Sequence, residues 1–92
     1  MKLHILKIKR AYAYAKLTGN KMFEIRENDR NFEVGDLVAY RVFDSEVLPI
    51  RAELIENNLY KITYVSDFEQ KKGYVVYGEK LIDGKVLWYQ IV

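Results

Sequence analysis

Short segments in which apolar and polar residues alternate make up most of this chain, and they limit the fold to one built largely from β-strands. Successive side chains of a strand point to opposite faces of a sheet, so alternation separates a buried face from a solvated one. The pattern predicts six strands, at residues 3–8, 22–26, 37–43, 59–65, 74–82 and 83–92.

One segment departs from the alternation and predicts a helix. Residues 10–18, RAYAYAKLT, contain three alanines among other good helix formers. Gly19 and Asn20 follow, and both residue types readily adopt the left-handed conformation that ends a helix. A helix of about three turns at ~3.6 residues each is marginal alone, so we expect it to be held by packing.

The number and order of these elements predict the fold class. Six strands and one helix in 92 residues, with no β-α-β rhythm, predict an α+β, mostly β fold in the form of a closed or nearly closed small barrel. Asp83-Gly84 separates the last two strands and is typical of a hairpin turn. A chain of this length is expected to form a single domain, residues 1–92.

Composition excludes several kinds of chemistry. Cysteine is absent and His4 is the single histidine, so disulfides, thiolate catalysis and cysteine- or histidine-rich metal sites are excluded. We expect neither a metal nor a cofactor. No stretch approaches the roughly 20 apolar residues of a membrane helix, and the N-terminal apolar run is shorter than the core of a signal peptide. The sequence therefore predicts a cytoplasmic protein that does not bind membranes.

Charge is distributed unevenly along the chain. Residues 1–23 contain six basic residues and no acid, whereas residues 24–56 contain nine acids and four arginines. If the basic residues lie on one face, they would attract phosphate or another anion. Alternatively, they keep a small protein in solution and pair with the acidic middle of the chain.

The segment GNKMFEIRENDR, residues 19–30, concentrates opposite charges beside two strand formers. Glu24 and Arg26 lie two apart, so they share one face of the predicted strand, and Lys21 precedes them where the helix ends. If this face is open to water, the pairs contribute only ~0–1 kcal/mol each. If it lines a pocket, Glu24 would orient the cations, and the cations would bind a phosphate or a carbonyl.

Gly19, Lys21, Glu24 and Arg26 together match the G-x-K-x-x-E-x-R signature of the ASCH superfamily, the domains related to activating signal cointegrator. The longer runs HILKI, GNKMFEIRENDRNFEVGD and ITYVSDFEQKKGYVV, in this order, are similar to a small bacterial and phage branch of that superfamily. The resemblance covers residues 2 to about 77 and implies a PUA-like β-barrel. Residues 78–92 resemble a C-terminal hairpin added to the branch.

The resemblance also implies a cleft beside the barrel that binds RNA or a nucleotide. In it, Lys21 would contact a phosphate or polarise a carbonyl, Glu24 would accept hydrogen bonds from a base edge, and Arg26 would brace Glu24 or clamp an anion. Gly35 and Asp36 match a turn that is common in PUA-like barrels, and we interpret that turn as structural.

Four further residues are weaker candidates for the same cleft. His4 and Lys7 lie on the first strand, which the resemblance places near the cleft, although a lone histidine is more often a structural residue. Asn28 and Arg30 could form a polar rim at the mouth of the pocket. The alternative for these two, which we favour, is a turn with incidental ion pairs.

The predicted function is a noncatalytic module that binds RNA or a nucleotide. An alternative is a small hydrolase of a modified nucleoside or RNA, with Lys21 and Glu24 as a proton-transfer pair. Relatives that resemble hydrolases have a threonine where this chain has Glu24, so a nucleophile is missing here. A second alternative is a protein-interaction domain that binds through a sheet edge or through the C-terminal hairpin, whose residues 86–92 are hydrophobic.

Overall fold

The structure is a computed structural model that describes residues 1–42 and 57–85. Its elements are β1 (Leu3–Ile8), α1 (Arg10–Leu17), β2 (Phe23–Glu27), β3 (Leu37–Val42), β4 (Asn58–Ser66) and β5 (Tyr74–Lys85). One helix and five strands in the described residues confirm the predicted α+β, mostly β fold class.

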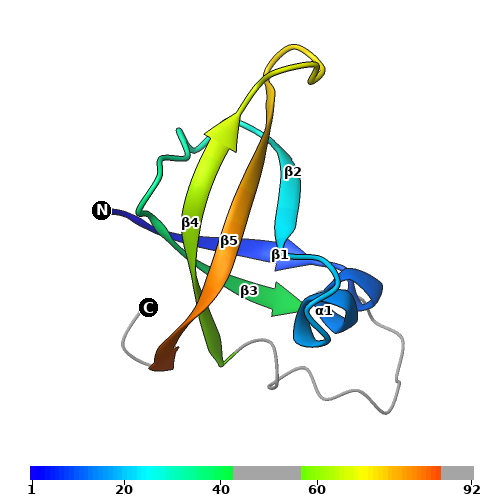
Figure 1. Cartoon of the computed structure of the whole chain (residues 1–92), viewed down its shortest axis with the longest axis vertical. Helices are drawn as coiled ribbons and strands as arrows, with labels where there is room; N and C mark the ends of the chain where they lie inside the picture. Colours follow the sequence, from blue (N-terminus) through cyan, green and yellow to red (C-terminus); the bar gives the residue numbers. More distant parts are fainter. Residues whose placement is uncertain (43–56, 86–92) are drawn as a thin grey trace.

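The five strands form one curled sheet with the shape of a half-barrel (Figure 1). Their order is β1-β3-β4-β5-β2, in which β1 and β3 are parallel and the other neighbours antiparallel. Helix α1 lies at the end of the sheet where β1 and β3 finish (Figure 1). The first two strands of the chain are therefore the two edges of the sheet, and helix α1 connects them.

The predicted hairpin turn at Asp83-Gly84 is wrong. Strand β5 continues through both residues to Lys85, and its pairing with β4 shifts between Leu59↔Ile82 and Asn58↔Lys85. The extra residues on β5 make a bulge, which is the other common use of glycine within a strand. The local turn signal is overruled because β4 offers a partner strand on both sides of Asp83-Gly84. The remainder of the predicted last strand, residues 86–92, lies outside the described residues.

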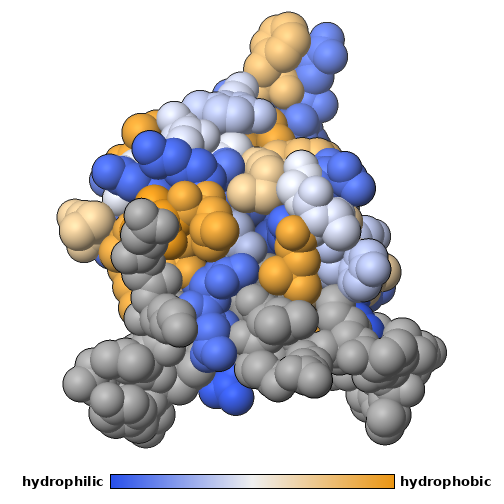
Figure 2. Space-filling view, turned by 60° about the horizontal axis from the view of Figure 1, so that its bottom comes forward, coloured by the Kyte–Doolittle hydropathy of each residue, from blue (hydrophilic) through white to orange (hydrophobic). Residues whose placement is uncertain are grey.

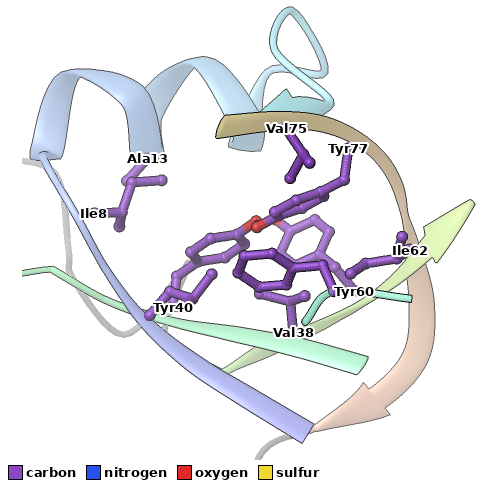
Figure 3. Packing of buried hydrophobic residues seen from close by; sticks show 10 residues of the cluster. Ile8, Ala13, Val38, Tyr40, Tyr60, Ile62, Val75 and Tyr77 are labelled. Carbon is purple, nitrogen blue, oxygen red and sulfur yellow. The ribbon is translucent and has the colours of Figure 1, made fainter. Parts of the chain in front are cut away.

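The core lies on the concave side of the curled sheet and is rich in tyrosine. Tyr40, Tyr60 and Tyr77 are almost fully buried and point toward one another from β3, β4 and β5 (Figure 3). Ala13 brings α1 against the same cluster beside Ile8 (Figure 3). Because a tyrosine carries a hydroxyl, a core of this kind needs internal hydrogen-bond partners.

The turn before β3 is structural, as the sequence predicted. Gly35 has a φ of 93°, in the left-handed region that favours glycine. The carboxylate of Asp36 accepts hydrogen bonds from the backbone N–H groups of Lys2 (3.1 Å) and Glu33 (3.2 Å). These bonds hold the start of β1 against the turn.

Candidate ligand-binding site

The charged residues of the 19–30 segment meet around the buried carboxylate of Glu24. Strand β2 pairs with β5 so that Glu24 lies opposite Tyr77, on the buried face of the sheet. Oε2 of Glu24 lies 2.7 Å from Nζ of Lys16 and 2.7 Å from Nζ of Lys21. Oε1 of Glu24 accepts a hydrogen bond of 3.1 Å from Nε of Arg26. Cations of the protein therefore engage both carboxylate oxygens.

Lys16 connects Glu24 to a second buried carboxylate, that of Glu79. Nζ of Lys16 donates a hydrogen bond to Oε2 of Glu79. Oε1 of Glu79 accepts a hydrogen bond from the hydroxyl of Tyr40, whose oxygen lies 2.7 Å from the hydroxyl oxygen of Tyr77. These five residues form a buried polar network that joins the hydrophobic core to the motif.

The two carboxylates of the buried polar network differ in proton affinity. Burial raises the pKa of Glu79 and outweighs the opposing effect of Lys16. Burial would also raise the pKa of Glu24, but the charges and hydrogen bonds of Lys16 and Lys21 outweigh it and lower the pKa. Glu24 is therefore ionised at neutral pH and acts as the counterion of the surrounding cations.

Arg26 links the two edges of the half-barrel. Its Nη2 donates a hydrogen bond of 2.8 Å to the backbone carbonyl oxygen of Lys7. Arg26 lies on β2 and Lys7 on β1, so this bond spans the opening between the two edge strands, which we call the seam. The Arg26 side chain is 24% exposed, so part of it can meet a ligand.

Two hollows lie in the seam, and Lys7, Ile25 and Arg26 line both of them. The larger hollow, of about 440 Å³, is also lined by Ile5, Leu6, Glu27, Asp29, Arg30, Phe32 and Tyr74. The smaller hollow, of about 260 Å³, is also lined by Ile8, Lys9, Tyr12 and Glu24. The larger volume falls within the range of about 300–1,000 Å³ that is typical of small-molecule sites.

The structure brings most of the predicted ligand-binding residues to the seam or beside it. Lys7 and Arg26 line both hollows, Glu24 lines the smaller one and Arg30 the larger one. Lys21 lies beside Glu24, with its Nζ 5.1 Å from the centre of the Tyr12 ring.

His4 and Asn28 line neither hollow. Nε2 of His4 lies 2.8 Å from Oδ2 of Asp36, and the His4 ring packs on Phe32 at 4.7 Å between ring centres. Oδ1 of Asn28 accepts a hydrogen bond of 3.0 Å from the backbone N–H of Phe32. Both side chains have structural partners, which agrees with the structural alternatives for these residues.

Sequence reasoning missed Lys16 and Glu79. Glu79 follows Val75 and Tyr77 at the same alternating spacing, so strand periodicity alone predicts a glutamate on the buried face. Lys16 lies three residues after the buried Ala13, on the helix face that packs against the sheet. In both cases the signal in the sequence is a charged residue at a position that periodicity assigns to a buried face.

A family model described as a domain of unknown function, DUF3850, matches residues 3–78, so the chain belongs to that family. The match extends from β1 into β5 and includes every residue that lines the two hollows. No curated protein shows significant sequence similarity to the chain. Within residues 1–42 and 57–85, no helix is long and apolar enough to cross a membrane. The same residues contain no cluster of histidine and carboxylate side chains suited to a metal ion.

Proposed function

We propose that this member of the DUF3850 family binds RNA or a nucleotide along the seam between β1 and β2. The observation that carries the proposal is the position of Arg26, which Glu24 and the Lys7 carbonyl hold in place between the two hollows. An arginine that is already oriented loses little side-chain entropy when it binds a phosphate. The resemblance of the 19–30 segment to the ASCH signature supports the same ligand class.

Lysines extend the cationic surface around Arg26. Lys7 and Lys9 are exposed and line the smaller hollow, and Lys21 lies next to it. Glu24, the one acid among the described residues that line this hollow, already has cations on both oxygens. The smaller hollow therefore attracts anions, as phosphate recognition requires. In this proposal Glu24 orients the cations and leaves contact with the base to other groups.

Replacing both Lys7 and Lys9 by alanine should weaken binding to single-stranded RNA and reduce its salt dependence. Each lost phosphate contact should make the slope of log K against log salt concentration shallower by about 0.7. Fluorescence anisotropy with a labelled oligoribonucleotide, measured over a series of salt concentrations, gives both quantities.

A second double variant controls for the loss of charge alone. Lys61 and Lys80 are exposed, lie opposite each other on β4 and β5, and line neither hollow. Lys61→Ala with Lys80→Ala removes the same charge and should leave most of the affinity and slope unchanged. Equal losses in both double variants would contradict a site at the seam, and absence of RNA and nucleotide binding at low salt would contradict the proposed function.

Hydrolysis of a modified nucleoside or RNA is the alternative proposal, with Lys21 and Glu24 as the proton-transfer pair. The geometry favours binding over this chemistry, because a general base needs a free lone pair and a suitable pKa. Glu24 has its oxygens bonded to three cations and a lowered pKa. Turnover of acylated nucleosides by the wild type, abolished in Glu24→Gln with binding retained, would establish the alternative.

Protein interaction is the second alternative, with a sheet edge or residues 86–92 as its predicted contact. Residues 86–92 lie outside the described residues. Exposed apolar side chains elsewhere include Phe23, Ile25 and Tyr64. On the face that Figure 2 shows, hydrophobic residues form separate patches with hydrophilic residues between them. A stable protein interface usually needs a contiguous apolar centre, which this face lacks. The support for a protein partner is therefore weaker than the support that the seam gives for RNA or a nucleotide.

A further inference from the structure

We infer that the seam binds a nucleotide in one orientation, with the phosphate in the smaller hollow and the base in the larger one. We further infer that the preferred base carries an exocyclic amino group. This inference rests on the proposed function and adds which end of the ligand lies where and which bases are selected. It follows from the different charges of the two hollows; a tyrosine lines each of them, Tyr12 the smaller and Tyr74 the larger.

The smaller hollow has the properties of a phosphate site. Among the described residues, its lining adds the cation of Lys9 to the residues that both hollows share. The carboxylate of Glu24 does not attract a hydrogen-bond donor of the ligand, because its oxygens are bonded to Lys16, Lys21 and Arg26. With the shared Lys7 and Arg26, the hollow presents three cations to a ligand.

The larger hollow has the properties of a base site. Beyond the shared residues, it has two carboxylates, those of Glu27 and Asp29, and the cation of Arg30. Carboxylates accept hydrogen bonds from the amino groups of bases and repel phosphate. Its wall contains the half-buried ring of Tyr74, and aromatic rings stack on unpaired bases. The hollow therefore favours a planar group that donates hydrogen bonds.

The shared residues fix the direction of the ligand. Arg26 and Lys7 lie at the border of both hollows, so a phosphate that binds them is adjacent to the larger hollow as well. A nucleotide placed the other way would put its phosphate against Glu27 and Asp29. Electrostatic repulsion there disfavours the reverse orientation.

Cytidine monophosphate and uridine monophosphate test the inference, because at ring position 4 cytosine has an amino group and uracil a carbonyl oxygen. We expect the cytidine nucleotide to bind about tenfold more tightly, since a hydrogen bond to a carboxylate is among the stronger ones. Titration by NMR at low salt gives both affinities and the amides that shift. Short oligocytidylate and oligouridylate of equal length serve as the second pair of probes.

Glu27→Gln with Asp29→Asn should remove the preference while leaving the affinity for uridine monophosphate unchanged or higher. Asp67→Asn with Glu69→Gln is the matched control, because both residues are exposed between β4 and β5 and line neither hollow. This control should keep the tenfold preference.

The possible failures are distinguishable. Equal binding of the cytidine and uridine probes, or a preference that survives in Glu27→Gln with Asp29→Asn, would contradict the inference and leave the proposed function in place. If neither nucleotide and neither oligonucleotide binds at low salt, both the proposed function and the inference are wrong.

Discussion

Lys16 shows how one residue can join the core of this protein to its candidate site. Its side chain is fully enclosed, and Glu24 and Glu79 balance its charge. Burial of an ion costs several kcal/mol, and the cost is recovered only when partners and hydrogen bonds surround the ion. Lys16 has both, since the backbone carbonyl oxygens of Lys21 and Phe23 also lie 3.4 Å from its Nζ. The network therefore holds the start of β2 against α1 and β5.

The opposite pKa directions of the two glutamates predict opposite effects of pH on stability. The pKa of Glu79 is raised above 4.5, so between 4.5 and the higher value the folded state binds more protons than the unfolded state. Through this residue, the free energy of unfolding falls as pH rises. We expect the free energy of unfolding of Glu79→Gln to fall less with rising pH than that of the wild type. Urea denaturation repeated at several pH values measures both.

Glu24→Gln is the matched comparison, because the pKa of Glu24 is lowered below 4.5. Its contribution to stability is present above pH 4.5 and is lost as pH falls through the pKa of the folded state. The variant should therefore lose less stability on acidification than the wild type does. Parallel pH profiles for the wild type and both variants would show that the two carboxylates do not titrate as the structure indicates.

Strand β5 is the element on which the site and the core both depend. It pairs with β2 on one side and β4 on the other, and it carries Tyr77 and Glu79 into the interior. Gly78 lies between them on the opposite face, beneath the ring of Tyr64 on β4. The ring of Tyr64 covers the backbone of Gly78, and a side chain at position 78 would prevent this contact.

Gly78→Ala should destabilise the protein by about 1 kcal/mol, because its Cβ would overlap the ring of Tyr64. The half-exposed ring can turn toward solvent, which keeps the loss near the lower end of the range for overpacking. Chemical denaturation measures the loss. Gly78→Ala combined with Tyr64→Ala should show a smaller loss than the sum of the two single variants. Strict additivity would mean that the two residues do not interact.

Across the whole molecule, the half-barrel leaves its two edge strands separated by the seam. Edge strands expose unpaired backbone groups, and proteins usually cover or block them. Here the side chain of Arg26 bridges part of the seam by its hydrogen bond to the Lys7 carbonyl oxygen. The same side chain borders both hollows, so closure of the half-barrel and the proposed ligand binding involve one residue.

Arg26→Lys should weaken this closure although it keeps the charge, because a lysine has no planar fork to bond Glu24 and Lys7 together. We expect a loss of about 0.5–1.5 kcal/mol in the free energy of unfolding. Amide hydrogen exchange should increase in β1 and β2 and change little in β4, which lies between other strands. Uniform changes in exchange across all strands would contradict a local role for Arg26 at the seam.

Much of the fold followed from local patterns. Alternation predicted β2 at residues 22–26 and β4 at residues 59–65, and the structure has them at Phe23–Glu27 and Asn58–Ser66. The turn signal at Asp83-Gly84 failed. The same dipeptide suits a turn or a bulge, and the length of the partner strand β4 decides between them.

The sequence by itself determined that the chain is mostly β and that Lys21, Glu24 and Arg26 are neighbours, because alternation and short spacing depend only on adjacent residues. Tertiary structure decided which other groups join them. Lys16 and Glu79 are separated by 63 positions in the chain and meet because Ala13 of α1 and Tyr77 of β5 pack into the same core cluster. The seam exists because the order of the strands places β1 and β2 at the edges of a curled sheet, and no local pattern carries that order.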